Sequence, residues 1–227
     1  MRKSTVVLLL CIVFSILTTK AQEHTYVSIT TAYGTAIVKL YNETPNHRNN
    51  FITYTKKGYF DKTLFHRVIK NFVIQGGDPD SFFLAPQPGY YTFGDKRLAP
   101  EFNDSIFHKR GILGMGRDDN KEQASFFTQL YLVQGKTYTD AQLDQIEQKY
   151  RAGKKFPAYQ REHYKTIGGL PHLDGHYMVI GEVVKGMEMV DAISDLKTDQ
   201  NDIPLEKVWM KVKVLKKKAV KKLLVTS

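Results

Sequence analysis

The stretch FHRVIKNFVIQGGDP, residues 65–79, contains two short runs of apolar and β-branched residues on either side of Lys70 and Asn71. This pattern predicts two antiparallel strands joined by a tight turn. Each run also contains a polar residue, Arg67 in the first and Gln75 in the second, at positions where strands usually carry packing residues. The hairpin therefore carries two polar groups whose purpose has to be explained.

The length of the turn decides whether these two side chains meet. Side chains alternate between the faces of a strand, so a two-residue loop would place Arg67 opposite Ile74 and leave Gln75 on the other face. A three-residue loop, 70–72, would place Arg67 opposite Gln75, with Asn71 in the left-handed conformation that such loops often need. A solvated sheet face that happens to carry an arginine and a glutamine is the simple alternative. Alternation further predicts that Phe65 shares the face of Arg67, while His66 lies on the opposite face in the core.

The first 21 residues have the features of a signal peptide. Arg2 and Lys3 precede an almost wholly apolar run, 6–17, which is too short to span a bilayer, and small residues follow up to Ala21. We expect cleavage after Ala21, no stable membrane insertion of the mature chain, and export to a bacterial periplasm, with secretion as the less favoured outcome. Cys11 is the only cysteine, so the mature chain would contain no thiol, disulfide or cysteine-based zinc site.

The basic charge of the chain is weak evidence for a polyanionic partner. Without 1–21, the chain keeps 30 basic and 23 acidic residues, a formal charge of +7. Much of this excess lies at the end, in KVKVLKKKAVKKLL, where the tail 215–227 contains five lysines, and a charge run of this kind usually forms a solvated face. Electrostatics alone would allow nucleic-acid binding, but an exported protein is not expected to meet nucleic acid.

Short strands dominate the rest of the chain. A helix is expected between them, with Thr44 as its N-cap, Pro45 in its first turn and Gly58 at its end. A second, short helix is expected over 187–193. The segment 80–100, rich in Pro, Gly and aromatic residues, has the composition of an ordered loop. Strands are expected over 26–31, 35–41, 111–116, 130–133, 177–184 and 208–214.

One segment, 136–169, differs from this pattern. Thr139 can cap a helix in which Leu143, Ile146 and Tyr150 recur at helical spacing, and a second helical stretch begins at Pro157. We interpret this segment as a helical insertion packed on the surface of a β domain. Stabilising a loop is its simpler role, and contacting a partner is the alternative.

The motifs FHRVI, FVIQGGDP, KRGILGMGR, LYLVQGK and HLDGHYMVIGEVVKGMEMVDAI occur in an order that resembles the cyclophilin-type peptidyl-prolyl cis-trans isomerases. The resemblance extends from about Tyr26 to Val214, apart from the insertion. It implies a single, mainly β domain over 22–227, a closed eight-stranded antiparallel barrel with two capping helices, here carrying the helical insertion. It also implies rotation of X-Pro bonds in proline-containing segments of folding proteins, without a metal or other cofactor. Nothing in the sequence indicates oligomerisation, and we expect a monomer.

The resemblance gives the two polar residues of the hairpin a purpose. It implies that Arg67 is the principal catalytic residue and that Gln75 lies beside it. Other motif positions correspond to substrate-binding residues of the family. By this correspondence the substrate-binding residues are Phe72, Val73, Gly116, Gln129, Tyr131, His172, Leu173 and Tyr177.

Several of these positions depart from the family pattern. Val73 stands where the family has methionine, Gly116 where it usually has alanine, His172 where many members have tryptophan, and Tyr177 where many have histidine. The loss of the tryptophan implies weaker binding of cyclosporin. The family motif SQFF can be matched to residues 124–127, which keeps both phenylalanines, or to 128–131, which keeps the glutamine and leads into LVQGK. We prefer the second alignment.

Three other functions are alternatives to the isomerase. His172, Asp174 and His176 form an H-x-D-x-H pattern that could bind a metal, but Leu-Asp-Gly is typical of a turn, which would direct the three side chains apart. A serine hydrolase is disfavoured because no G-x-S-x-G motif occurs. The main alternative is a proline-recognising chaperone or scaffold with little turnover. Retention of Arg67 beside the pocket residues favours the enzyme.

Overall fold

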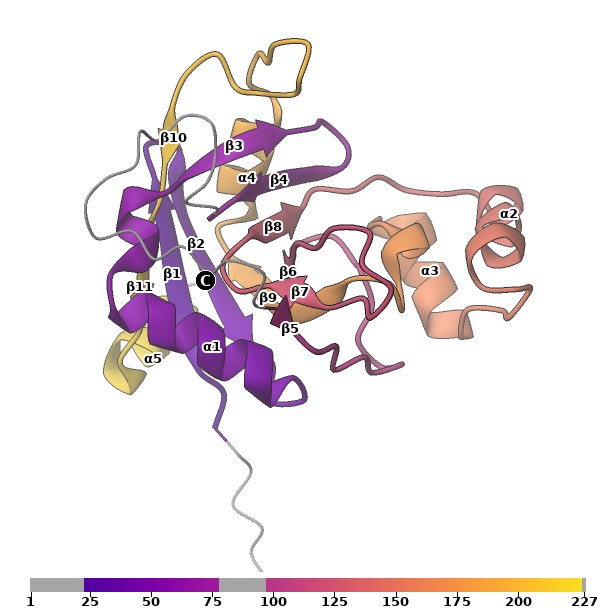
Figure 1. Ribbon diagram of the computed structural model, residues 1–227, viewed down its shortest axis with the longest axis horizontal. Helices are drawn as coiled ribbons and strands as arrows, with labels where there is room; N and C mark the ends of the chain where they lie inside the picture. The colour runs from indigo at the N-terminus through magenta and orange to yellow at the C-terminus, as the bar shows by residue number, and fades with distance from the viewer. Residues whose placement is uncertain (1–22, 78–96, 226–227) are drawn as a thin grey trace, which may run out of the picture.

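The computed structural model describes residues 23–77 and 97–225. The expected signal peptide, 1–21, and most of the expected ordered loop, 80–100, lie outside the described residues. The main sheet is antiparallel, with the strand order β10-β3-β4-β8-β6-β9-β2-β1-β11 (Figure 1). Its strands are β1 (Tyr26–Thr31), β2 (Gly34–Leu40), β3 (Leu64–Val68), β4 (Val73–Gly76), β6 (Ile112–Met115), β8 (Leu130–Val133), β9 (Met178–Lys185), β10 (Val208–Trp209) and β11 (Lys211–Val214).

The sheet closes into a barrel through the last strand of the chain. β10 pairs with β3 at one edge of the strand order and β11 pairs with β1 at the other edge. Only Met210 separates the two pieces, and its amide donates to the Thr63 carbonyl at 3.1 Å. The nine assigned strands are therefore the eight of the predicted barrel, with the final strand interrupted once. Its predicted alternation is also present, because Val208, Met210 and Val212 are buried between exposed residues.

The hairpin of β3 and β4 adopts the three-residue loop. Arg67 lies opposite Gln75 in the register, and Asn71 has a φ of 61°, in the left-handed region. Alternation fails at the start of β3, because the register shifts between Phe65 and Arg67. This bulge turns Phe65 into the barrel core instead of onto the face of Arg67. His66, expected in the core, lies at the bulge and is only half-buried.

Two helices pack against the barrel core, α1 (Pro45–Lys56) through Phe51 and α4 (Met187–Ser194) through Met189, Val190 and Ile193. A short 3-10 helix, η1 (Tyr59–Lys62), follows α1. These are the two capping helices that the sequence predicts.

The N-terminus of α1 is capped differently from the prediction. Thr44 occupies the N-cap position but makes no capping hydrogen bond, and its buried hydroxyl has no hydrogen-bond partner among the described residues. The carboxylate of Glu101 instead accepts from the backbone amides of Asn46 and His47, each at 3.0 Å. A carboxylate also suits the positive end of the helix dipole better than a hydroxyl does.

The helical insertion projects from one side of the barrel (Figure 1) and contains α2 (Asp140–Tyr150) and α3 (Ala158–Thr166). Thr139 caps α2 as predicted, in a reciprocal capping box with Gln142. A backbone bridge between Lys136 and Gly169 closes the insertion at its base. Its own small core, formed by Leu143, Phe156 and Tyr164, also includes Phe107 from the barrel side.

Several elements were not predicted. The basic tail forms a helix, α5 (Lys217–Val225), whose Leu223 carbonyl accepts from Lys185 Nζ at 3.0 Å. Two-residue strands β5 (Arg97–Leu98) and β7 (Ser125–Phe126) pair with each other, and a 3-10 helix, η2 (Pro171–Leu173), precedes β9.

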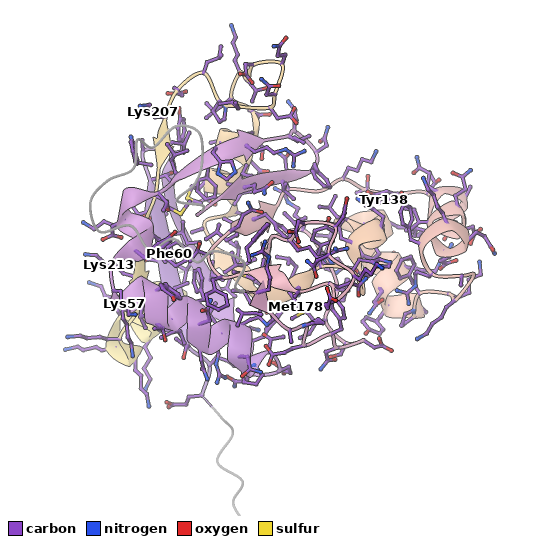
Figure 2. The ribbon with its side chains drawn as sticks, viewed as in Figure 1. Lys57, Phe60, Tyr138, Met178, Lys207 and Lys213 are labelled. Carbon is purple, nitrogen blue, oxygen red and sulfur yellow. The ribbon has the colours of Figure 1, made fainter. Side chains whose placement is uncertain are left out.

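Figure 2 shows Lys207 and Lys213 on the far side of the barrel from Tyr138 of the insertion. Within the described ranges, every helix is too short or too polar to cross a membrane.

Candidate active site

A pocket of about 300 Å³ lies over the outer face of strands β3, β4, β6 and β8. Its residues come from segments far apart in the chain, which the barrel register brings together. All the predicted site residues except His172 line it: Arg67, Gln75, Phe72, Val73, Gly116, Gln129, Tyr131, Leu173 and Tyr177. Arg117, which the sequence analysis did not assign, completes the lining.

Arg67 is held on two sides. Its Nη1 donates to Gln75 Oε1 at 3.2 Å, and its Nη2 lies 3.6 Å from Asp202 Oδ2, a weak ion pair. The Arg67 side chain is 40% exposed and lines the pocket, so it is accessible to a ligand there. The cross-strand pairing of Arg67 with Gln75 fixes a permanently charged, multidentate donor beside an apolar slot.

Tyr131 forms the deep wall of the slot and is 5% exposed. It lies opposite Gly114 on the neighbouring strand, and a Cβ added to Gly114 would lie 2.2 Å from Tyr131 Cζ. The glycine therefore makes room for the tyrosine ring. Tyr177 meets this ring edge-on, with ring centroids 6.4 Å apart. Phe72, Val73 and Leu173 belong to the same apolar cluster, outside the barrel core.

The hydroxyl of Tyr131 is anchored in a buried polar chain. Tyr131 Oη and His108 Nε2 are 2.8 Å apart, and His108 Nδ1 lies 2.9 Å from Asp174 Oδ1. Tyr164 of α3 donates to the other oxygen of Asp174 at 2.7 Å. Burial raises the pKa of the Tyr131 hydroxyl well above its usual value, so this hydroxyl stays neutral. This chain of hydrogen bonds therefore connects the insertion to the pocket wall.

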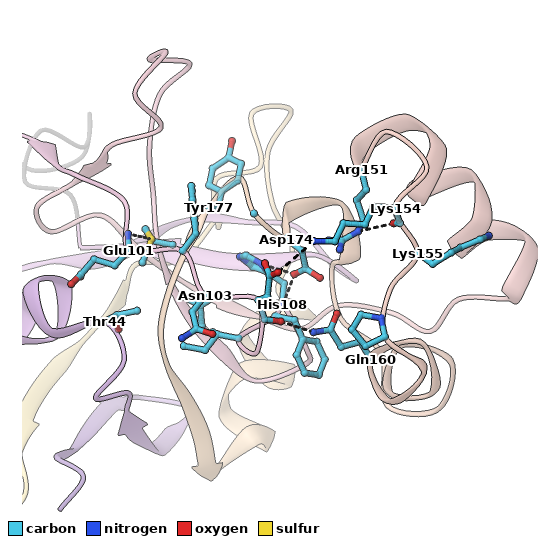
Figure 3. A pocket seen from close by; sticks show the side chains of 18 residues that line it. Thr44, Glu101, Asn103, His108, Arg151, Lys154, Lys155, Gln160, Asp174 and Tyr177 are labelled. Atoms are coloured by element: carbon cyan, nitrogen blue, oxygen red, sulfur yellow. Dashed lines mark hydrogen bonds and ion pairs between the residues drawn. The ribbon is translucent and has the colours of Figure 1, made fainter. Parts of the chain in front are cut away.

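His108 and Asp174 also line a smaller cavity, of about 120 Å³, between the barrel and the insertion. Figure 3 shows these two side chains hydrogen-bonded to each other. Glu101 and Asn103 lie on one side of the pair, and Arg151 and Gln160 lie on the other. The amide of Gln160 donates to the Asp104 carbonyl at 3.0 Å, which ties α3 to the barrel. This cavity belongs to the attachment of the insertion.

The H-x-D-x-H residues have separate partners. Asp174 accepts the buried hydrogen bonds described above, whereas the His172 ring stacks on Phe72. His176 lies within hydrogen-bonding distance of Gln123 Nε2 and the Tyr150 carbonyl. Within 23–77 and 97–225, no three His, Cys, Asp or Glu side chains are grouped to hold a metal ion.

Gln129 and Gly116 are neighbours in the pocket. A Cβ on Gly116 would lie 2.1 Å from Gln129 Oε1, so the glycine, where the family usually has alanine, leaves space that the glutamine side chain fills. Phe127 would take the last position of the SQFF motif in the other alignment. Its ring packs near Tyr54 of α1, with ring centroids 6.4 Å apart. Among the described residues, Gln129 lines the pocket and Phe127 does not.

His172 lies just outside the pocket. Its ring stacks on Phe72 with centroids 5.9 Å apart and planes inclined by 13°, and Tyr150 of α2 lies on another side of the ring. Burial lowers the pKa of His172, and nearby His108 adds to this effect. His172 therefore supports Phe72 from behind and does not line the slot.

Arg117 is the residue that sequence reasoning missed, although it directly follows the GILGMG motif. Its guanidinium lies over the Tyr177 ring, 4.7 Å from the centroid, and its Nε donates to the His176 carbonyl at 2.8 Å. A cation over an aromatic face holds both groups in place. The pocket thus has two arginines at its rim.

Comparison with known proteins assigns this arrangement to a family. Residues 26–214 match the family model described as cyclophilin type peptidyl-prolyl cis-trans isomerase/CLD. The chain is a cyclophilin.

A "putative peptidyl-prolyl cis-trans isomerase" of Staphylococcus aureus strain USA300 is 32% identical over 177 residues, which cover 77% of this cyclophilin and 83% of the relative. A "putative bifunctional phosphatase/peptidyl-prolyl cis-trans isomerase" of Streptococcus pyogenes is 31% identical over 187 residues. That match covers 80% of this chain but only 37% of the longer relative.

Solved structures share the fold. A cyclophilin-type isomerase of Cryptosporidium parvum has a TM-score of 0.63 and 22% identity, covering 86% of this chain and 99% of its own. A second structure of that isomerase, in the presence of the dipeptide Ala-Pro, has a TM-score of 0.61 and 22% identity, with coverage of 84% and 99%. The barrel of this cyclophilin is therefore a known architecture.

Proposed function

We propose that this cyclophilin catalyses cis-trans rotation of X-Pro bonds in exported proteins and so assists their folding. The observation that carries the proposal is the position of the Arg67–Gln75 pair at the rim of an apolar slot made by Phe72, Val73 and Tyr131. The Ala-Pro dipeptide in the related Cryptosporidium structure supports a proline-containing ligand.

The chemistry of the reaction fits these residue types. Amide resonance gives X-Pro rotation a barrier of roughly 18–20 kcal/mol, and spontaneous exchange takes tens to hundreds of seconds. As the C–N bond twists, the prolyl nitrogen becomes pyramidal, and its lone pair, no longer delocalised into the carbonyl, can accept a hydrogen bond. Arg67 can donate to that nitrogen, while the slot holds the ring and excludes water. A thousandfold acceleration requires about 4 kcal/mol of differential stabilisation, which a preorganised charged donor in a desolvated site can approach.

The test is cis-trans exchange in an Ala-Pro-Phe peptide, measured by NMR with the purified protein. We expect fast exchange, and a loss of about 100- to 1,000-fold in kcat/KM for Arg67→Ala, the range found when one preorganised donor is removed. Arg67→Lys should recover only part of the rate, because lysine lacks the planar fork. Arg48→Ala, on the surface of α1, is the matched control and should leave the rate unchanged.

The binding of the same peptide separates the enzyme from the alternative chaperone. If Arg67 acts on the twisted amide, Arg67→Ala will weaken binding much less than turnover. Tight binding without acceleration by the unmodified protein would overturn the proposal in favour of a proline-recognising binder. Export is tested separately: the mature chain in the periplasmic fraction should begin near Gln22 by mass spectrometry.

A further inference from the structure

A second hollow, of about 550 Å³, lies between the hairpin loop of β3 and β4 and the helical insertion. The hairpin contributes Lys70 and Phe72, and the insertion contributes Lys136, Ile146 and Tyr150. We call this hollow the insertion groove. The residues that recur at helical spacing along α2 lead into the insertion groove. Leu143 is buried in the insertion, Ile146 is half-buried and Tyr150 is 39% exposed.

The insertion groove is continuous with the proline pocket. Phe72 lines both of them, and His172, stacked on Phe72 at 5.9 Å, lies on the groove side of the ring. A polypeptide whose proline occupies the pocket must leave it in two directions. Because Phe72 lines both hollows, the insertion groove is available to one of these two paths.

The charge of the groove is one-sided. None of its lining residues is acidic. Lys136 lies over the Tyr138 ring, 5.6 Å from the centroid, and no carboxylate of the described residues forms an ion pair with it. Lys70 is paired with Asp195 at 2.7 Å, but both side chains are more than half exposed, so a ligand carboxylate can compete for the lysine.

We propose that the insertion groove binds the part of the substrate chain that flanks the proline, and that it selects an acidic residue followed or preceded by an apolar one. The lysines attract the carboxylate, while Ile146, Tyr150 and the outer face of His172 receive the apolar side chain. The inference rests on the proposed function, because it assumes that the occupant continues from a proline in the pocket. It gives the insertion a role in substrate choice beyond stabilising a loop.

The test is a panel of Ala-Pro peptides in which a single glutamate is moved from four residues before the proline to four residues after it. NMR exchange and chemical-shift titration give turnover and Kd for each peptide. We expect about 3- to 10-fold tighter binding for glutamate at one or two positions on one side of the proline only. The gain should shrink at high salt, because exposed charges are screened.

Charge reversal makes the test specific. Lys136→Glu should abolish the preference for glutamate and create one for lysine at the same peptide position. Lys213→Glu, on β11 across the barrel (Figure 2), changes the net charge equally and should leave the preference intact. Tyr150→Ala, at the exposed end of α2, should weaken the binding of peptides that carry an apolar residue beside the glutamate. It should not weaken the binding of peptides that carry alanine there.

The outcomes separate this inference from the proposed function. Equal binding of acidic and basic peptides at every position, or equal effects of the Lys136 and Lys213 variants, would overturn the insertion groove as a substrate site while leaving catalysis in place. Position-specific binding without accelerated exchange would support the groove and overturn the isomerase.

Discussion

At the scale of single residues, Arg67, the arginine proposed to act on the prolyl amide, lies between the Gln75 amide and the Asp202 carboxylate. Asp202 lies 3.6 Å from Arg67 Nη2 and is 43% exposed, so the pair contributes about 0–1 kcal/mol. Asp202 has a φ of 64°, which asparagine also tolerates. We therefore expect Asp202→Asn to keep the fold and to change kcat/KM less than about fivefold. A loss as large as that of Arg67→Ala would show instead that the carboxylate orients the guanidinium.

Much of the pocket could be predicted at this scale, and the reasons differ between residues. The pairing of Arg67 with Gln75 follows from a local signal, the Asn71 turn. The hydrogen bond between Tyr131 and His108 could not be predicted, because it depends on the barrel register and not on a short motif. His172 was assigned to the pocket by resemblance, yet a stacked imidazole reaches only the back of Phe72.

At the scale of elements, the contact of β6 with β8 sets the depth of the slot. Gly114→Ala would place a methyl group 2.2 Å from a Tyr131 ring that is anchored by its hydroxyl. We expect a loss of about 1–3 kcal/mol in the free energy of unfolding, as for other overpacked sites, together with weaker binding of proline peptides. Urea denaturation and peptide titration measure the two effects.

Gly116→Ala is the matched control on the same strand end. Its new Cβ would meet the side chain of Gln129, which is flexible and only half-buried. This side chain can rotate away, so the stability loss should be clearly smaller than for Gly114→Ala. Equal losses for the two variants would contradict the anchored position of Tyr131.

The capping of α2 gives a second prediction about an element. Thr139 accepts from the Gln142 amide at 3.3 Å, and the Gln142 side chain accepts from the Thr139 amide at 2.9 Å. Thr139→Ala should lower the free energy of unfolding by about 1 kcal/mol and speed amide hydrogen exchange in α2. The rate of cis-trans isomerisation of a short Ala-Pro-Phe peptide should stay unchanged. Thr44→Val removes a buried hydroxyl that caps nothing, so it should leave stability within about 0.5 kcal/mol.

These two threonines also show what sequence can and cannot predict about an element. Both precede clear helices, but only Thr139 caps its helix, because its partner is three residues away. The cap of α1 comes from Glu101, 55 residues beyond Asn46, and short-range patterns contain no such information. Likewise, the lysine-rich composition of α5 resembles a solvated run as much as a helix.

At the scale of the whole molecule, buried and half-buried histidines make stability depend on pH. Burial lowers the pKa of His47, His163 and His172 below the ordinary 6.5. The folded state therefore binds fewer protons than the unfolded state, and stability present above pH 6.5 is lost as the pH falls below it. We expect a lower free energy of unfolding at pH 5.5 than at pH 7.5 in urea titrations.

The carboxylates extend this loss at lower pH. Burial tends to raise the pKa of Glu101, but the amides of Asn46 and His47 and the His47 ring outweigh it and hold the pKa below its usual value. Stability from this group is present above pH 4.5 and disappears as Glu101 is protonated. Unfolding free energies that do not fall between pH 7.5 and pH 4 would contradict both assignments.

The interrupted final strand has a consequence for how the chain folds. β10 and β11 join the third strand of the barrel to the first, and they lie at residues 208–214, near the end of the chain. The ring of strands cannot close until residues 208–214, which follow all the other strands, are available, and long-range pairings of this kind slow folding. During synthesis, the earlier strands therefore keep unpaired edges until residues 208–214 are available. The last strand to be made is thus the one that removes both open edges of the sheet at once.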